Sequence, residues 1–134
     1  KDVLVGEVWL CSGQSNMEWS VNAAKDPAKE LAESDPNVRM FTVPKRAIGM
    51  PQTSIPNGKW VPSSPQTAGS FSAVGFSFAK HLYAKLKVPI GMIHTSWGGT
   101  PAEAWTDIEW MAKDPITKPM VDRALDQGQA SPLL

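Results

Sequence analysis

The sequence predicts an α/β fold in which parallel strands alternate with helices. Three apolar, β-prone stretches, at 3–10, 38–43 and 90–93, indicate strands. Segments with helical signals lie between them, and this order favours parallel pairing through right-handed crossovers. The carboxyl ends of the first and third strands are then expected at one edge of the sheet, where open α/β sheets bind their ligands.

The first stretch, Val3 to Leu10, is predicted to be a buried strand, and Cys11 behind it to pack as a small hydrophobic residue. Gly13 interrupts the apolar run, and the polar triplet Gln14-Ser15-Asn16 follows at once. A serine held at the end of a rigid strand is a candidate nucleophile. The local pattern alone fits an ordinary polar turn equally well.

Asp26 and Pro27 are typical of a helix start, with Asp as the cap and Pro at the first helical position, and this helix is expected to end near Glu33. The segment 44–66, rich in Pro, Gly and Ser, is predicted to be one long loop that carries an exposed Trp60. Loops of this length are usually functional or mobile, so it is either a substrate wall or a simple surface excursion.

The main helix is expected to begin at Ser70 or Ser72 and to continue to about Lys87. Apolar residues recur every fourth position and predict its buried face: Val74, Phe78, Leu82 and Leu86, with Phe71, Ala79 and Tyr83 beside them. His81 falls mostly off that face and is interpreted as a surface residue.

Two shorter helices are expected after the third strand. Thr106 is predicted to cap one of them, with Glu109 three residues later as its capping-box partner. A second helix is predicted over 117–127, and residues 128–134 are expected to be a frayed end.

The gross composition excludes several classes of function. A length of 134 residues suits one domain, and 13 basic and 13 acidic residues leave no net charge, so nothing indicates a nucleic-acid partner. No apolar run approaches the roughly 18 residues of a membrane span. The two histidines are not clustered and the one cysteine is alone, so neither a metal site nor a cofactor is expected. Six tryptophans suit stacking on sugar rings, although most are expected to be core or loop anchors.

Three blocks of the sequence together resemble one family. Gly13-Gln14-Ser15-Asn16-Met17 is similar to the first block of the SGNH (GDSL-like) hydrolases, within them to the sialate O-acetylesterase and acetylxylan-esterase-related branch. The stretches 88–105 and 71–80 resemble the same branch, so the likeness runs from about Val3 to Trp110. It implies a three-layer, flavodoxin-like SGNH hydrolase fold with a parallel sheet, here incomplete. The division that it implies is one partial catalytic domain over 1–134, with a nucleophile block at 8–19, the long loop at 44–66, the main helix at 71–87 and an oxyanion-glycine block at 88–105.

The resemblance also implies roles for individual residues. Ser15 matches the nucleophile, and its own N–H together with an N–H of the Gly98-Gly99 turn matches the oxyanion donors, Gly98 being preferred. The Gly-x-Ser-x-Gly elbow of α/β-hydrolases is not formed here. A supporting shell is expected from Gln14, Asn16, Trp97 and Glu103. The expected substrates are O-acetylated sialic acids or, alternatively, acetylxylan or another acetylated polysaccharide.

The catalytic base is missing from the sequence. The family takes its His and orienting Asp from an Asp-x-x-His motif, which does not occur in this chain, and His94 falls where the family has no base. A serine without a base reacts too slowly to be useful. We therefore expect the chain to be a fragment whose partner is the remainder of the catalytic domain. The absence of a signal peptide, and a start almost inside the first strand, fit a removed native start.

Two other readings remain. A non-catalytic sugar-binding module or pseudoenzyme would keep the cleft without the base. A nucleotide binder ranks last, because no P-loop or Gly-x-Gly-x-x-Gly follows the first strand. The resemblance implies a secreted, periplasmic or lysosomal location.

Overall fold

The computed structural model describes residues 2–47 and 52–127, which form two compact units. The first contains the described residues of 1–45 and 55–99, and the second those of 46–54 and 100–127. The first unit is built from β1 (Glu7–Cys11), α1 (Ser15–Glu18), the short 3-10 helix η1 (Val21–Ala23), α2 (Pro27–Ala32), β2 (Val38–Thr42), β3 (Trp60–Pro62), α3 (Ala73–Leu86) and β4 (Ile90–His94). The second holds η2 (Ala102–Trp105), α4 (Ile108–Lys113) and α5 (Lys118–Asp126).

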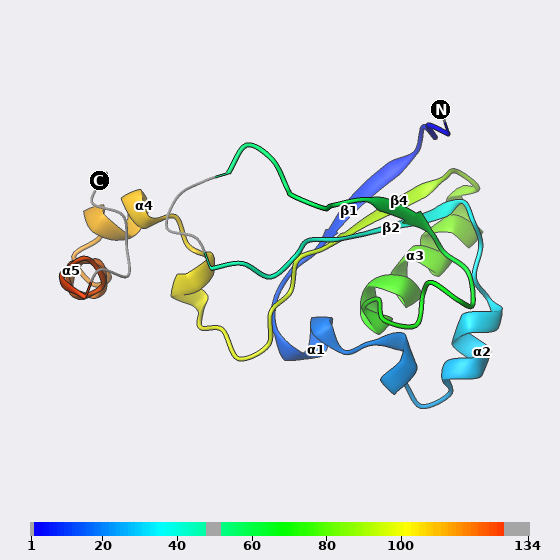
Figure 1. Cartoon of the computed structure of the whole chain (residues 1–134), viewed down its shortest axis with the longest axis horizontal. Helices are drawn as coiled ribbons and strands as arrows, with labels where there is room; N and C mark the ends of the chain where they lie inside the picture. Colours follow the sequence, from blue (N-terminus) through cyan, green and yellow to red (C-terminus); the bar gives the residue numbers. More distant parts are fainter. Residues whose placement is uncertain (1, 48–51, 128–134) are drawn as a thin grey trace. The chain divides into compact units, whose positions relative to one another are not determined.

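The first unit is an α/β structure around a four-stranded sheet of order β1-β4-β2-β3 (Figure 1). β4 pairs in parallel with β1 and with β2, which confirms the predicted fold class and the parallel pairing of the three expected strands. β3 adds an antiparallel edge, so the sheet is mixed and the prediction of one uninterrupted loop over 44–66 is wrong. Trp60 explains the extra strand, because its ring packs on Phe41 of β2 with the centroids 5.4 Å apart.

β1 differs from the predicted buried strand. It begins at Glu7, and it forms an edge of the sheet in which Val8 and Leu10 are 62% and 64% exposed. Side chains alternate between the two faces of a strand. Trp9 meets Phe78 of α3 edge-on at 5.1 Å, and the last residue of the strand, Cys11, is buried as expected. Within this apolar run, Trp9 and Cys11 lie on the face of β1 that packs toward α3, whereas Val8 and Leu10 lie on the opposite, exposed face.

α3 lies along one face of the sheet (Figure 1) and supplies much of the core. Its start at Ser72 is confirmed, since the Ser72 hydroxyl accepts the Gly75 N–H at 3.0 Å. The predicted buried face is confirmed in part. Ala79 is buried, as is Phe71 before the helix, and Leu82 and Tyr83 pack against the core. Val74, Phe78 and Leu86 are instead 42–48% exposed, and Gly75 and Phe76, which were not predicted, are buried. The helix meets the strands through Gly75, whose missing side chain permits a close approach to Cys11. His81 is exposed, as expected.

Two further helix starts can be compared with the sequence. The cap of α2 is confirmed, because Asp26 accepts the Lys29 N–H at 3.2 Å. The cap of α4 is Asp107 rather than Thr106: Asp107 accepts two backbone N–H groups, whereas the Thr106 hydroxyl donates to the Ala102 carbonyl of η2. α5 matches the predicted helix over 117–127, and the expectation for 128–134 lies outside the described residues. Within the described part of the chain, no helix has the length and apolar character needed to cross a bilayer.

Candidate active site

The turn that carries Ser15 begins where β1 ends. Gly13 has a φ of +129°, a backbone conformation that glycine adopts readily, and Gln14 occupies the N-cap position of α1. Ser15 is thus the first residue of α1, and it is exposed. The segment behind α1 is fixed to the start of α3 by two backbone hydrogen bonds, from Val21 N–H to Phe71 and from Ala73 N–H to Trp19. The segment that follows Ser15 is therefore held in place against the start of α3.

The chain that leaves β4 runs beside the chain that leaves β1. Thr95 N–H donates to the Cys11 carbonyl at 2.9 Å, and Trp97 N–H donates to the Gly13 carbonyl at 3.0 Å. The side-by-side course of the two chains therefore continues beyond the sheet and places Gly98 next to Ser15. A Cβ built on Gly98 would lie 3.6 Å from Ser15 Oγ. The predicted meeting of the two turns at one sheet edge is confirmed, and their chemical roles stay predictions.

Glu18 is a site residue that the sequence analysis missed. One oxygen of its carboxylate accepts the backbone N–H of Gly98, and the other pairs with the ammonium group of Lys45. Lys45 Nζ in turn lies 5.8 Å from the centroid of the Trp97 ring. The available signal was spacing, because residues three apart on a helix face the same side and Glu18 is three residues beyond Ser15.

The other predicted residues fall in different places. Gln14 and Asn16 flank Ser15 and are exposed, and Trp97 is half-buried next to Lys45. Glu103 belongs to η2 of the second unit, and Gly99 follows Gly98 with a φ of +78°. Their expected roles remain predictions.

His94 ends β4 and is buried, at 7% exposed. Its Nε2 atom is hydrogen bonded to the Ser96 hydroxyl, and its Nδ1 atom has no hydrogen-bond partner among the described residues. Burial lowers the pKa of this imidazole, and the nearby positive charge of Lys45 lowers it further. The imidazole is thus buried and hydrogen bonded to Ser96, and that it is not the base stays a prediction.

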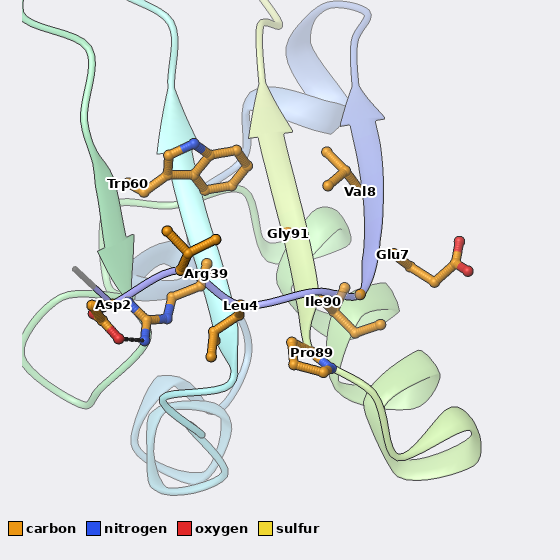
Figure 2. A pocket seen from close by; sticks show the side chains of 11 residues that line it. Asp2, Leu4, Glu7, Val8, Arg39, Trp60, Pro89, Ile90 and Gly91 are labelled. Atoms are coloured by element: carbon orange, nitrogen blue, oxygen red, sulfur yellow. Dashed lines mark hydrogen bonds and ion pairs between the residues drawn. The ribbon is translucent and has the colours of Figure 1, made fainter.

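Two hollows mark opposite ends of the sheet. A groove of about 390 Å³ is lined by Ser15, Glu18, Trp19, Ser20, Ala23 and Gly98. A pocket of about 370 Å³ lies instead where β1 and β4 begin, with Trp60 reaching toward Gly91 and Arg39 paired to Asp2 at 2.8 Å (Figure 2). Ligands of open α/β sheets bind beyond the carboxyl ends of the strands, so the groove beside Ser15 is the candidate active site.

Comparison with known proteins defines the class. A family model described as "Carbohydrate esterase, sialic acid-specific acetylesterase" matches residues 5–131. The chain belongs to this family of carbohydrate esterases.

Individual relatives agree with the family assignment. The sialate O-acetylesterase of Rattus norvegicus is 39% identical over 115 residues, and that of Homo sapiens is 40% identical over 114 residues. Each match covers 78% of this chain but only 21% and 22% of the relative, so the chain spans about a fifth of the length of these proteins. A crystal structure of a carbohydrate acetylesterase from Xanthomonas citri is similar with a TM-score of 0.79 and 45% identity, over 84% of this chain and 26% of that one.

Proposed function

We propose that this chain carries the nucleophile of a carbohydrate esterase that hydrolyses O-acetyl esters of sialic acids. The observation that supports this most is the exposed Ser15 beside the glycine turn of Gly98 at the carboxyl edge of the sheet. The curated relatives are sialate O-acetylesterases, which supports sialate as the substrate, and the similar Xanthomonas citri structure is a carbohydrate acetylesterase, which supports an acetylated carbohydrate.

The proposed reaction is acyl transfer through Ser15. Its Oγ attacks the carbonyl carbon of the acetyl group while a base removes the hydroxyl proton. The carbonyl oxygen becomes negative, and backbone N–H groups of Ser15 and of the Gly98-Gly99 turn stabilise it. Collapse of the tetrahedral intermediate breaks the bond to the sugar oxygen, which takes the proton from the base. Water then attacks the acetyl-serine and releases acetate, which restores the hydroxyl of Ser15.

The base is proposed to come from a part of the whole protein outside these 134 residues. His94 does not suit the role, since it is 7% exposed and its Nε2 atom is hydrogen bonded to the Ser96 hydroxyl. That remaining part of the catalytic domain and the acetylated sugar are the proposed partners. A secreted, periplasmic or lysosomal location belongs to the same proposal, and membership of this family is compatible with it.

The test is acetate release by the complete gene product from 9-O-acetylated sialic acid and from acetylated xylan. We expect Ser15→Ala to lower the rate on the preferred substrate by at least about 10³-fold. Ser12→Ala, which changes another exposed serine of the same turn, is the matched control and should stay close to the parent. Undiminished hydrolysis by Ser15→Ala would show that another residue is the nucleophile.

An inactive parent that still binds the sugars would favour the sugar-binding module over the esterase. A higher kcat/KM on acetylated xylan than on the sialic acid would change the substrate and keep the mechanism.

A further inference from the structure

Glu18 connects three segments around the candidate nucleophile. It belongs to the same turn of α1 as Ser15. It accepts the N–H of Gly98, which follows β4 in the chain, and it pairs with Lys45, which follows β2. Its side chain is 30% exposed and that of Lys45 is 44% exposed, so the pair lies at the wall of the groove rather than in the core.

We propose that Glu18 is a positioning residue for the acyl transfer, one that anchors the glycine turn through Gly98 and leaves the Gly99 N–H as the oxyanion donor of that turn. This inference rests on the proposed function of Ser15. It assigns Gly98 and Gly99 different tasks, the first as the anchored residue and the second as the donor.

The Gly98 N–H is already engaged in a hydrogen bond to the Glu18 carboxylate. One N–H group cannot donate fully to a carboxylate and to a substrate oxygen at the same time. A hydrogen bond to a charged acceptor is also stronger than one to a neutral carbonyl. The Gly98 N–H is therefore committed to Glu18, and this bond ties the glycine turn to the helix that presents Ser15.

The two glycines of the turn differ in the space around them. A Cβ on Gly98 would lie 2.7 Å from Glu18 Oε2, so this residue faces the protein. A Cβ on Gly99 would meet nothing within 4 Å, and Gly99 is exposed. Its φ of +78° also differs from that of an extended chain, so the peptide turns at this point. The Cβ side of Gly99 is therefore open to an incoming acyl group, whereas that of Gly98 is filled by Glu18.

Lys45 makes the arrangement compatible with the reaction. A bare carboxylate next to the groove would oppose the negative charge that develops on the acetyl oxygen. The ammonium group of Lys45 pairs with the second oxygen of Glu18 and offsets that charge. The same ammonium group lies near the ring of Trp97, the residue that precedes Gly98.

The experiment compares four variants of the complete gene product in the hydrolysis of 4-nitrophenyl acetate. Glu18→Ala removes the acceptor, Glu18→Asp keeps the charge but shortens the reach, and Glu18→Gln keeps the reach without the charge. Glu33→Ala is the matched control, because Glu33 also pairs with a lysine, Lys80. Ser15→Ala is measured beside them.

We expect Glu18→Ala and Glu18→Asp to lower kcat by about 10²-fold with little change in KM, as for a displaced catalytic group. Glu18→Gln should keep kcat within about fivefold of the parent, because its amide oxygen still accepts the Gly98 N–H. Glu33→Ala should leave kcat unchanged. If Glu18→Ala does not fold, the contrast between the Asp and Gln variants decides.

A kcat of Glu18→Ala equal to or above that of the parent would overturn the proposal, since the carboxylate would then compete for the donor instead of anchoring it. A loss in the Gln variant as large as that in the Ala variant, with a smaller loss in the Asp variant, would overturn it too, because the charge rather than the reach of the hydrogen-bond acceptor would then be responsible. A fully active Ser15→Ala is a different failure, that of the proposed function itself.

Discussion

Ser15 and Gly98 approach so closely that a methyl group on Gly98 would lie 3.6 Å from the serine hydroxyl oxygen. The same methyl would lie 2.7 Å from Glu18 Oε2, closer than carbon and oxygen atoms pack without a shift. We expect Gly98→Ala to displace Glu18 and to lower kcat by roughly 10- to 100-fold, because small displacements of a catalytic turn are costly. Steady-state kinetics of 4-nitrophenyl acetate hydrolysis by the complete gene product is the measurement.

The control for this prediction is the double variant Glu18→Ala/Gly98→Ala. Without the Glu18 side chain the added methyl no longer clashes with it, so the two losses should not add, and a coupling of about 0.5–3 kcal/mol is expected for residues in contact. Strict additivity would contradict the contact.

Gly75 of α3 stands against Cys11 of β1 in the core. A Cβ at Gly75 would come within 2.8 Å of Cys11 Sγ and 3.4 Å of Phe71 and Ser72. Alanine improves helix propensity by about 1 kcal/mol, whereas overpacking a core costs about 1–3 kcal/mol. Gly75→Ala should therefore lower the free energy of unfolding, measured by urea denaturation, by up to about 2 kcal/mol.

Cys11→Ala combined with Gly75→Ala provides the check on that prediction. Removal of the sulfur leaves room for the new methyl, so the double variant should be more stable than the sum of the two single changes implies. A Gly75→Ala protein as stable as the parent would show that the helix shifts freely on the sheet.

The parts of the molecule that sequence could predict are those with a strong local pattern. The strand before Gly13 and the strand before Thr95 are runs of apolar residues followed by polar ones, and parallel pairing then places their ends together. Asp26 and Ser72 likewise act as caps, as their types and positions indicate.

The parts that sequence missed depend on contacts between distant segments. β3 exists because Trp60 packs on Phe41, although the surrounding residues have the composition of a loop. The buried face of α3 is set by the close approach at Gly75, which a count of large apolar residues ignores. The hydrogen bond from Gly98 to Glu18 joins a backbone group to a side chain far away in the chain, and no local pattern encodes it.

The thiol of Cys11 should be chemically inert in the folded protein. Cys11 is 3% exposed, and burial raises the pKa of its thiol above the ordinary 9.0. The thiolate is the reactive form, so both access and ionisation oppose modification. We expect iodoacetamide at pH 8 to label the Cys11 peptide at least about tenfold more slowly in the native complete gene product than in urea, as followed by mass spectrometry. Equal rates would mean that β1 opens readily.

His94 should make the stability of the fold fall as the pH falls. Burial first, and then the charge of Lys45, lower the pKa of this imidazole in the folded state below its ordinary 6.5. Well above pH 6.5 the ring is neutral in both states and has no effect on the pH dependence. As the pH falls through 6.5 the unfolded chain takes up the proton first, and folding loses up to about 1.4 kcal/mol for each pH unit until the folded pKa is reached. His94→Gln should flatten this dependence in urea denaturation between pH 7.5 and 5, whereas His81→Gln, a change at the exposed histidine, should leave the slope of the parent. A slope that persists in His94→Gln would assign the effect to other groups.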